Sequence, residues 1–351
     1  MLNSPYTVGV IVPTGVGAAI GGYAGDALPV VKAISHIADR VITHPNVMNG
    51  ASLYWNLPNA LYVEGFGLDQ FAANRWGLEP VRHNRIGLLI DQGIEQTLRW
   101  RHLQVADAAR ATLGLDLTDY VVTDEPLQVE LRTAESGATW GTIGNPDSLL
   151  RAAGRLIDTA GATAIAVIVR FPEDQEATAL QAYRHGQGVD PLAGAEAVIS
   201  HLIVRQFQIP CAHAPALSPL PLDTEISPRS AAEELGHTFL PCVLAGLSRA
   251  PQFTTQPQQG IWANALDAIV IPASCCGGSA ILSLSQTKTQ IITVEENTTR
   301  MQVYPRDLGI HTVPVRSYLE AIGAIVSHRA GITAQSLQAT IEPIQPLSRD
   351  S

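Results

Sequence analysis

Three runs of small residues are the parts of this chain whose residue types suit ligand binding. They are 14–25 (TGVGAAIGGYAG), 136–145 (SGATWGTIGN) and 273–280 (ASCCGGSA). The first and the third each follow an apolar stretch that ends in proline, at 8–13 and 268–272. Small residues at a strand-to-helix turn let backbone N–H groups point at a ligand, and a helix N-terminus favours an anion there. The pattern therefore predicts a site for a small anionic molecule.

Six residues of these runs are the predicted ligand contacts: Gly15, Gly17, Ser136, Thr139, Gly277 and Gly278. The first run departs from the dinucleotide fingerprint, because Gly15, Gly17 and Gly21 are spaced G-x-G-x-x-x-G. The second run contains no lysine, which disfavours an ATP-type P-loop. Neither pattern supports a nucleotide cofactor, and the alternative for each run is a turn needed only for tight packing.

Adjacent thiols in the third run are candidates for chemistry. Cys275 and Cys276 follow a predicted strand and precede a predicted helix. A thiol near a helix N-terminus has a lowered pKa, which suits a nucleophile or an acid–base group. Because neighbouring side chains point in different directions, only one of the two can face a cleft, and Cys276 is the predicted one. The alternative is that both are small buried residues that fill space.

Charged residues at the ends of predicted strands are the other catalytic candidates. Asp91, Arg170 and Glu295 follow or end the strands 85–90, 163–169 and 290–294. Ligands of α/β folds bind beyond the carboxyl ends of strands. The alternative for any one of them is a helix cap or a solvated turn. Further acidic residues of strand ends or turns are Asp26, Glu64, Asp69, Asp124, Glu125, Asp190 and Glu296.

Two groups of histidines allow other chemistry. His44, beside Asn46 in a long irregular segment, is either a general base or a turn residue. A metal site is the second option, formed by Cys211, His213, His237 and Cys242. Structural zinc sites usually contain two pairs of ligands, and the two members of each pair are close in sequence. Here only one such pair, C-x-H, occurs. No cofactor is favoured, the cofactor stays unknown, and a divalent metal is left open.

The elements that must position these residues alternate along the chain. Apolar runs predict strands at 7–12, 85–91, 120–123, 163–171, 268–271 and 290–294, and periodicity predicts helices at 27–40, 94–113, 146–160, 192–206 and 315–328. Alternation predicts an α/β fold: a mostly parallel sheet with helices on both faces, in two lobes around a cleft. The predicted lobes are 1–135 and 136–335, followed by a tail, 336–351. The likeness of the two proline-ended strands also fits a weak internal duplication.

Composition narrows the class of protein. Of the 351 residues 46% are hydrophobic, 5% are aromatic and 15% are charged, so a large aliphatic core is expected. A formal net charge of −10 disfavours nucleic acid as a partner. The four cysteines form no C-x-x-C pair, which fits a reducing compartment. With no signal-peptide pattern and no run of about 20 apolar residues, we expect a cytoplasmic protein without a membrane partner. A homo-oligomer is left open.

Several longer segments carry a family resemblance. They are 13–27 (PTGVGAAIGGYAGDA), 43–55 (THPNVMNGASLYW), 62–69 (YVEGFGLD), 136–152 (SGATWGTIGNPDSLLRA), 210–215 (PCAHAP), 272–280 (PASCCGGSA) and 294–299 (VEENTT). The chain resembles an uncharacterised family of cyanobacteria and plant plastids, a domain of unknown function. The resemblance spans nearly the whole chain and implies no established activity, so it adds no catalytic residue. The lack of a transit peptide favours a bacterial source.

These observations lead to one principal hypothesis and two alternatives. The principal hypothesis is an isomerase, lyase or hydrolase without a redox cofactor, acting on a small phosphorylated or carboxylated metabolite. A cysteine-dependent racemase-like version needs a cysteine in both proline-ended turns, and Thr14 occupies that place in the first. The alternatives are a cysteine–histidine metalloprotein and a non-catalytic binding or assembly protein.

Overall fold

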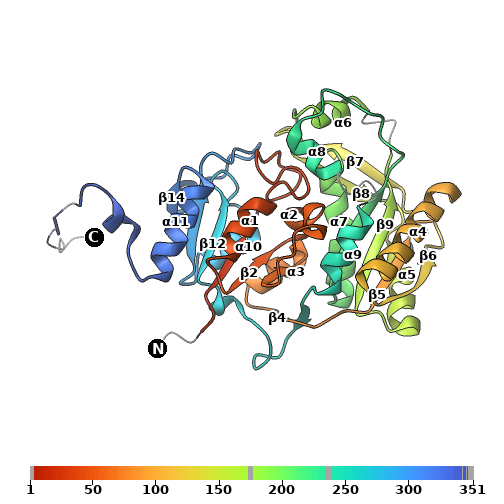
Figure 1. The fold of residues 1–351 in the computed structure, drawn as a ribbon, viewed down its shortest axis with the longest axis horizontal. Helices are drawn as coiled ribbons and strands as arrows, with labels where there is room; N and C mark the ends of the chain where they lie inside the picture. Colours follow the sequence, from red (N-terminus) through yellow and green to blue (C-terminus); the bar gives the residue numbers. More distant parts are fainter. Residues whose placement is uncertain (1–3, 173–176, 235–238, 342, 345, 347–351) are drawn as a thin grey trace.

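Two parallel sheets form the frame of the protein. The computed structural model describes residues 4–172, 177–234, 239–341, 343–344 and 346. The larger sheet has six strands in the order β14-β13-β12-β1-β2-β3. The smaller has four, in the order β10-β9-β5-β6. Figure 1 shows the larger sheet among the red and blue parts of the chain and the smaller among the yellow and green parts.

Every strand pair in these two sheets is parallel, which confirms the predicted α/β class. The strands of the larger sheet are β1 (Thr7–Val10), β2 (Arg40–Thr43), β3 (Ala60–Tyr62), β12 (Ala268–Pro272), β13 (Gln290–Val294) and β14 (Val313–Val315). Those of the smaller sheet are β5 (Ile86–Ile90), β6 (Leu117–Val122), β9 (Ala164–Arg170) and β10 (Cys211–Ala216). The central strands are continuous apolar runs because helices cover both of their faces.

Helices lie on both faces of each sheet. In the larger sheet α1 (Leu28–Ser35) and α11 (Tyr318–Arg329) pack on one face, and α3 (Gly65–Ala72) and α10 (Ser279–Leu284) pack on the other. In the smaller sheet α5 (Pro146–Ala160) and α7 (Ala193–Phe207) cover one face, and α4 (Gln96–Leu113) and α9 (Leu240–Ser248) lie on the other. The remaining helices are short: α2 (Pro45–Met48), α6 (Ala177–Arg184) and α8 (Pro228–Glu234).

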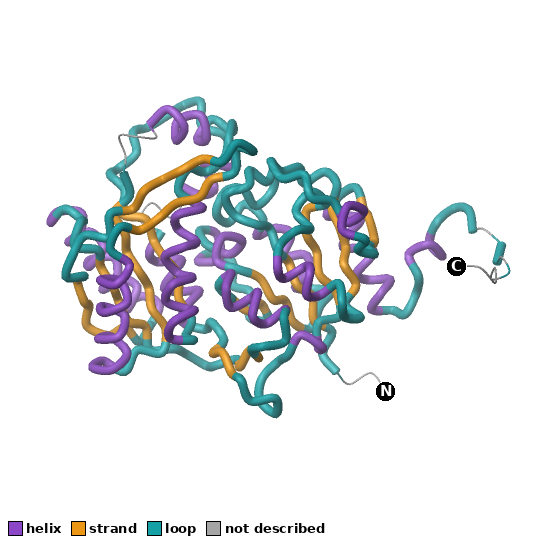
Figure 2. Tube along the Cα trace, turned by 180° about the vertical axis from the view of Figure 1, so that it is seen from behind, coloured by secondary structure: helices purple, strands orange, loops and turns teal. Residues whose placement is uncertain are grey.

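Two small antiparallel pairs complete the fold. The hairpin of β7 (Val129–Thr133) and β8 (Thr139–Ile143) contains the second run of small residues. The other pair joins β4 (Gly77–Glu79) to β11 (Gln252–Thr254). Seen from behind, the two parallel sheets lie side by side with helices between them (Figure 2).

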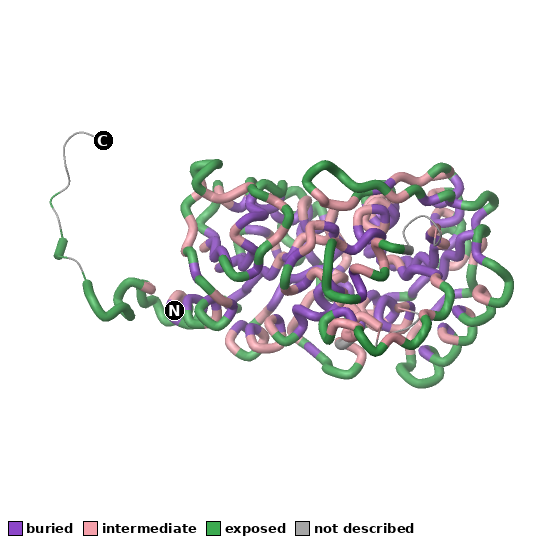
Figure 3. The backbone as a smooth tube through the Cα atoms, turned by 90° about the horizontal axis from the view of Figure 1, so that it is seen from above, coloured by how far each residue is buried: buried purple, intermediate pink, exposed green. Residues whose placement is uncertain are grey.

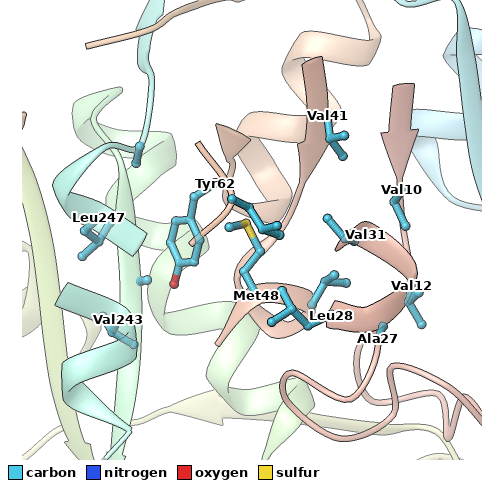
Figure 4. Close-up of a cluster of buried hydrophobic side chains, with 14 of the residues drawn as sticks. Val10, Val12, Ala27, Leu28, Val31, Val41, Met48, Tyr62, Val243 and Leu247 are labelled. Carbon is cyan, nitrogen blue, oxygen red and sulfur yellow. The ribbon is translucent and has the colours of Figure 1, made fainter. Parts of the chain in front are cut away.

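A shared hydrophobic core joins the two sheets. Helix α9 contributes Leu240, Val243, Leu244 and Leu247 to a cluster that contains strand residues of both sheets. Figure 4 shows Val243 and Leu247 of this helix beside Tyr62 at the end of β3, with Met48 and Leu28 beyond. The helix approaches closely because residue 246 is a glycine, where an added Cβ would lie 2.5 Å from the Tyr62 ring. The sheets are therefore held together by packing.

The sheets divide the chain differently from the predicted lobes. The larger sheet takes β1 to β3 from the beginning of the chain and β12 to β14 from the end, and the smaller takes its strands from between them. A boundary at residue 135 runs through both sheets, so the lobes 1–135 and 136–335 stay a prediction about folding units. Residues 330–341, which follow α11, are mostly exposed and extend from the body (Figure 3). The tail at 336–351 stays a prediction.

Several predicted elements have different limits in the structure. The helix expected at 27–40 ends at Ser35, because the chain must turn to begin β2 at Arg40. Asp26 does not cap that helix, and instead accepts a hydrogen bond from the Gly21 N–H and pairs with Arg229. The helix ends expected at Gly114 and Gly161 are confirmed, since both glycines adopt the left-handed conformation.

Candidate functional site

A cavity of about 320 Å³ lies between the two sheets, and we call it the central cavity. Its first wall comes from the carboxyl ends of the larger sheet: Pro13 and Thr14 follow β1, His44 follows β2, Glu64 follows β3, and Cys275, Gly278 and Ser279 follow β12. Its second wall includes Glu196, Ser200 and His201 of α7, His213 of β10 and Glu233 of α8. The cavity therefore occupies the place where α/β folds bind ligands.

One histidine–carboxylate pair connects the two walls. Glu64 is the N-cap of α3, where its Oε2 accepts hydrogen bonds from the backbone N–H groups of Phe66 (2.8 Å) and Gly67 (3.2 Å). Its other oxygen is hydrogen-bonded to Nδ1 of His201. Burial disfavours the charged imidazolium, but the hydrogen bond and charge of Glu64 outweigh burial and raise the pKa of His201. An imidazole oriented by a carboxylate is a common general acid or base in enzymes.

A second histidine–carboxylate pair joins Glu196, nearer the N-terminus of α7, to His213 of β10. The Nε2 atom of His213 is 3.6 Å from a carboxylate oxygen of Glu196, and its Nδ1 is 3.2 Å from the hydroxyl of Ser200. Residues 196, 197, 200 and 201 share one face of the helix because they are spaced by one turn or one position. His213 points to the same helix because alternate residues of β10 face α7. This arrangement places a hydroxyl, an imidazole and a carboxylate in series.

His44 is held in one tautomer. The backbone N–H of Val12 donates to Nε2 of His44 at 3.0 Å, so this nitrogen carries a lone pair. Burial lowers the pKa of His44 to about 4, and the ring is therefore neutral at physiological pH. In the neutral ring the proton then belongs to Nδ1. His44 is 7% exposed and lines the central cavity.

Four carboxyl groups are part of the lining. Glu64, Asp69, Glu196 and Glu233 all line the cavity, and its lining within the described ranges contains no lysine or arginine. Burial and the charge of Asp190 hold the pKa of Glu233 well above its usual range, and Tyr183 donates a hydrogen bond to its side chain at 2.7 Å. Burial and the charge of Glu196 likewise raise the pKa of Asp190 to about 7. Of these two groups only Glu233 lines the cavity, and its raised pKa favours the protonated carboxyl group there.

The first and third runs of small residues meet at the central cavity, and the second lies behind the first. Gly278 lines the cavity, whereas an added Cβ at Gly277 would lie 2.9 Å from the Val303 side chain. Residues 136–145, all of which are described, do not contribute to the lining. Thr139 contacts the first run through its N–H, which donates to the Gly15 carbonyl at 2.8 Å.

The glycines of the first run are tightly packed. Gly15 and Gly17 have φ values of +70° and +63°. An added Cβ would lie 2.9 Å from the Thr139 hydroxyl at Gly15 and 2.9 Å from the Val189 side chain at Gly17. The structure thus gives both residues a packing role, and Ser136 is exposed at the hairpin turn. Ligand binding by Gly15, Gly17, Ser136, Thr139 and Gly277 stays a prediction.

Asp91 and Arg170 lie apart from the central cavity. They line a second cavity that shares no described residue with the first. Asp91 accepts hydrogen bonds from the backbone N–H groups of Gly93 (2.9 Å), Leu127 (3.0 Å) and Arg170 (3.1 Å), which organise the loops beyond β5. Arg170 pairs with Glu95 at 3.0 Å. This arrangement does not support a role for Asp91 and Arg170 in a reaction within the central cavity.

The other two predicted catalytic residues, Cys276 and Glu295, are not part of the central cavity lining either. Cys276 is fully buried, and burial raises its pKa to about 11, the opposite of the lowering expected at a helix N-terminus. Its neighbour Cys275 is the cysteine that lines the cavity, with Sγ 3.2 Å from the Thr299 hydroxyl. Burial raises the pKa of Cys275 as well. Glu295 is exposed after β13 and is not part of the cavity lining.

The described residues among the four predicted metal ligands lie in three different places in the structure. Cys211 is buried in the core beside α7, and the Cys242 thiol donates to the Gly50 carbonyl at 3.4 Å. His213 lies in the central cavity, and His237 is outside the described residues. Across the described ranges no three His, Cys, Asp or Glu side chains are grouped so that they could hold a metal ion.

Helix α7 carries three cavity-lining candidates that were not predicted from the sequence, Glu196, Ser200 and His201. A signal for them existed, since all three fall on one face of a helix that was itself predicted. Their partners were among the candidates, because Glu64 was noted at a strand end and His213 as a metal ligand. The pairing of residues from different sheets could not be inferred from spacing.

Comparison with known proteins identifies the family. Residues 7–338 match the model of a family described as a protein of unknown function, DUF3326. The chain belongs to this family. The resemblance inferred from the motifs is thereby confirmed.

A relative in Synechococcus sp., named an uncharacterized lipoprotein, is 59% identical over 340 residues, which cover 96% of this chain and 94% of the relative. No solved structure matches the chain. Within the described ranges no helix has both the length and the apolarity to cross a bilayer. The cytoplasmic location stays a prediction.

Proposed function

We propose that the protein is an enzyme that transfers protons on a small metabolite bound in the central cavity. The observation that carries this proposal is the pair formed by Glu64 and His201, which joins the two walls of one cavity. A general base must be oriented and must have a pKa near the working pH. Glu64 supplies both the orientation and the raised pKa of His201.

The chemistry follows from these two side chains. His201 takes a proton from the substrate or from a water molecule, and the Glu64 carboxylate stabilises the imidazolium that forms. Return of the proton to another substrate atom gives an isomerase, loss of a leaving group gives a lyase, and attack by the activated water gives a hydrolase. These are the reaction classes expected from the sequence.

The charged groups in the cavity lining indicate which charge the substrate carries. The glycine-rich runs predict a phosphorylated or carboxylated metabolite. The carboxyl groups in the cavity, and the lack of lysine and arginine in its described lining, favour an uncharged molecule instead. Both classes therefore belong in the test.

Deuterium incorporation tests the proposal without knowledge of the product. The full-length protein is incubated in D₂O with uncharged hydroxycarbonyl compounds, hydroxy acids and sugar phosphates, and proton NMR follows the C–H signals. We expect exchange or conversion of at least one compound, slowed about a hundredfold or more by His201→Asn. The control is His83→Asn, which alters an exposed histidine. Failure of every compound to react, or an unchanged rate in His201→Asn, would contradict the proposal.

A specific arrangement favours a second candidate function, hydrolysis through a serine nucleophile. Ser200, His213 and Glu196 stand in the order hydroxyl, imidazole, carboxylate, at 3.2 Å and 3.6 Å. A fluorophosphonate should then label Ser200, as seen by mass spectrometry, and Ser200→Ala should remove the label. Absence of the label in a protein that still exchanges deuterium would leave only the first candidate.

A further inference from the structure

His44 presents a hydrogen-bond donor to the central cavity. We infer that this cavity binds the oxygen of an uncharged carbonyl group through the Nδ1–H of His44. The inference rests on the proposed function because it names the substrate class for the same cavity.

The parallel pairing of β1 and β2 places His44 beside Val12. Thr7, Val8 and Gly9 of β1 pair with Arg40, Val41 and Ile42 of β2, so both chains leave the sheet at the same edge. The hydroxyl of Thr43 donates to the Val10 carbonyl at 2.9 Å and fixes the end of β2. The next residue, His44, then receives the Val12 N–H on Nε2 at 3.0 Å. A proton on Nε2 would set two donors against each other, so the ring carries its proton on Nδ1.

The Nδ1–H group has no acceptor among the described residues of the protein. Only 7% of the His44 surface is exposed, and the residue lines the cavity. The Nδ1 atom is not among the described side-chain atoms that are both buried and without a hydrogen-bond partner, so it is open to the cavity. An acceptor oxygen of a ligand in the cavity can therefore reach it.

The lining determines which kind of oxygen fits. A carboxylate or phosphate oxygen would bring negative charge beside the carboxyl groups of Glu64, Asp69 and Glu196, with no lysine or arginine in the described lining to balance it. A carbonyl oxygen accepts the same hydrogen bond and brings no charge. Because His44 stays neutral, it polarises the carbonyl as a hydrogen-bond donor. Polarisation acidifies the C–H next to the carbonyl, which is the proton that His201 would remove.

The tautomer and the ligand contact are measured together on full-length protein labelled with [¹⁵N]histidine. Long-range ¹H–¹⁵N NMR should show a protonated Nδ1 and an unprotonated Nε2 for His44 at neutral pH. The probes are dihydroxyacetone, acetamide, acetate and ethylammonium. We expect dihydroxyacetone and acetamide to shift the Nδ1–H resonance in a saturable way, with acetate binding at least about tenfold more weakly. A protonated Nε2, tighter binding of acetate or ethylammonium, or no shift with any probe would overturn the inference.

Two variants distinguish the donor from the fold. His44→Gln keeps an acceptor for the Val12 N–H and removes the imidazole donor, so it should fold and bind dihydroxyacetone at least about tenfold more weakly. His83→Gln, at an exposed position, should bind it normally. Equal binding by His44→Gln and the wild type overturns the inference.

The outcome is separable from that of the proposed function. His201→Asn should retain probe binding at His44 and lose deuterium exchange. If the probes bind as expected and no compound exchanges, the proposed proton transfer fails and the carbonyl site stands. If exchange depends on His201 while His44 binds no probe, the proton transfer stands and the carbonyl site fails.

Discussion

Glu64 and His201 are 137 positions apart in the chain, yet their side chains are hydrogen-bonded in one cavity. The carboxylate begins α3 beyond the larger sheet, and the imidazole projects from α7 on the smaller sheet. The same carboxylate caps a helix and orients a base. Its two functions can be separated by substitution.

Glu64→Gln should lower the pKa of His201. The amide removes the negative charge that stabilises the imidazolium, whereas its oxygen can still accept from the Phe66 and Gly67 N–H groups. NMR titration of His201 measures the shift. The capping contribution is compared through Glu64→Ala, which should cost about 1 kcal/mol more of unfolding free energy than Glu64→Gln. An unchanged pKa of His201 would show that the pair does not form in solution.

His44 should make the protein less stable as the pH falls from about 6.5 to about 4. The unfolded chain binds a proton on this ring below its ordinary pKa of 6.5, whereas the folded ring stays neutral until about pH 4. Stability present above pH 6.5 is therefore lost through this window, by about 3 kcal/mol in total. Urea unfolding at several pH values measures it. The difference in pH dependence between wild type and His44→Gln isolates this residue, and identical curves would contradict the prediction.

Gly15→Ala should destabilise the protein by at least about 2 kcal/mol. Its φ of +70° disfavours any side chain, and the new methyl group would meet the Thr139 hydroxyl at 2.9 Å. Gly114→Ala is the matched control, because φ there is +66° and nothing lies within 4 Å of the added Cβ. That control should cost only about 1 kcal/mol. Equal costs in chemical denaturation would show that the turn around Gly15 yields to the methyl group.

The four thiols should react slowly with iodoacetamide while the protein is folded. All four cysteines are buried and free, and burial raises the pKa of Cys276 and of Cys242 to about 11. Since the thiolate is the reactive form, folded protein at pH 7.5 should react about a hundredfold more slowly than protein in urea. Mass spectrometry counts the modified thiols. Rapid modification of Cys276 in the folded protein would contradict this prediction and would support the role of Cys276 as a nucleophile.

Sequence patterns predicted part of the fold and part of the candidate site. The strand predicted at 163–171 and the helix predicted at 146–160 are present as β9 and α5, because their burial pattern and end residues are local properties. Strand-end positions directed attention to Glu64, which lines the central cavity, and the proline-ended turns that follow β1 and β12 meet at the same cavity. Asp91 also follows a strand, but its carboxylate lies outside the central cavity and accepts hydrogen bonds from backbone N–H groups of loops.

Tertiary structure alone decided which of these residues meet. The order β14-β13-β12-β1-β2-β3 brings the two ends of the chain into one sheet, and no local pattern specifies that pairing. Packing of α9 between the sheets then sets α7 against α3, so that His201 reaches Glu64. The sequence by itself determined the α/β class, six of the described strands (β1, β5, β6, β9, β12 and β13), five helices (α1, α4, α5, α7 and α11) and the family, because these depend on neighbours along the chain. The cavity, the tautomer of His44 and the burial of Cys276 depend on contacts between distant segments, which only the folded chain brings together.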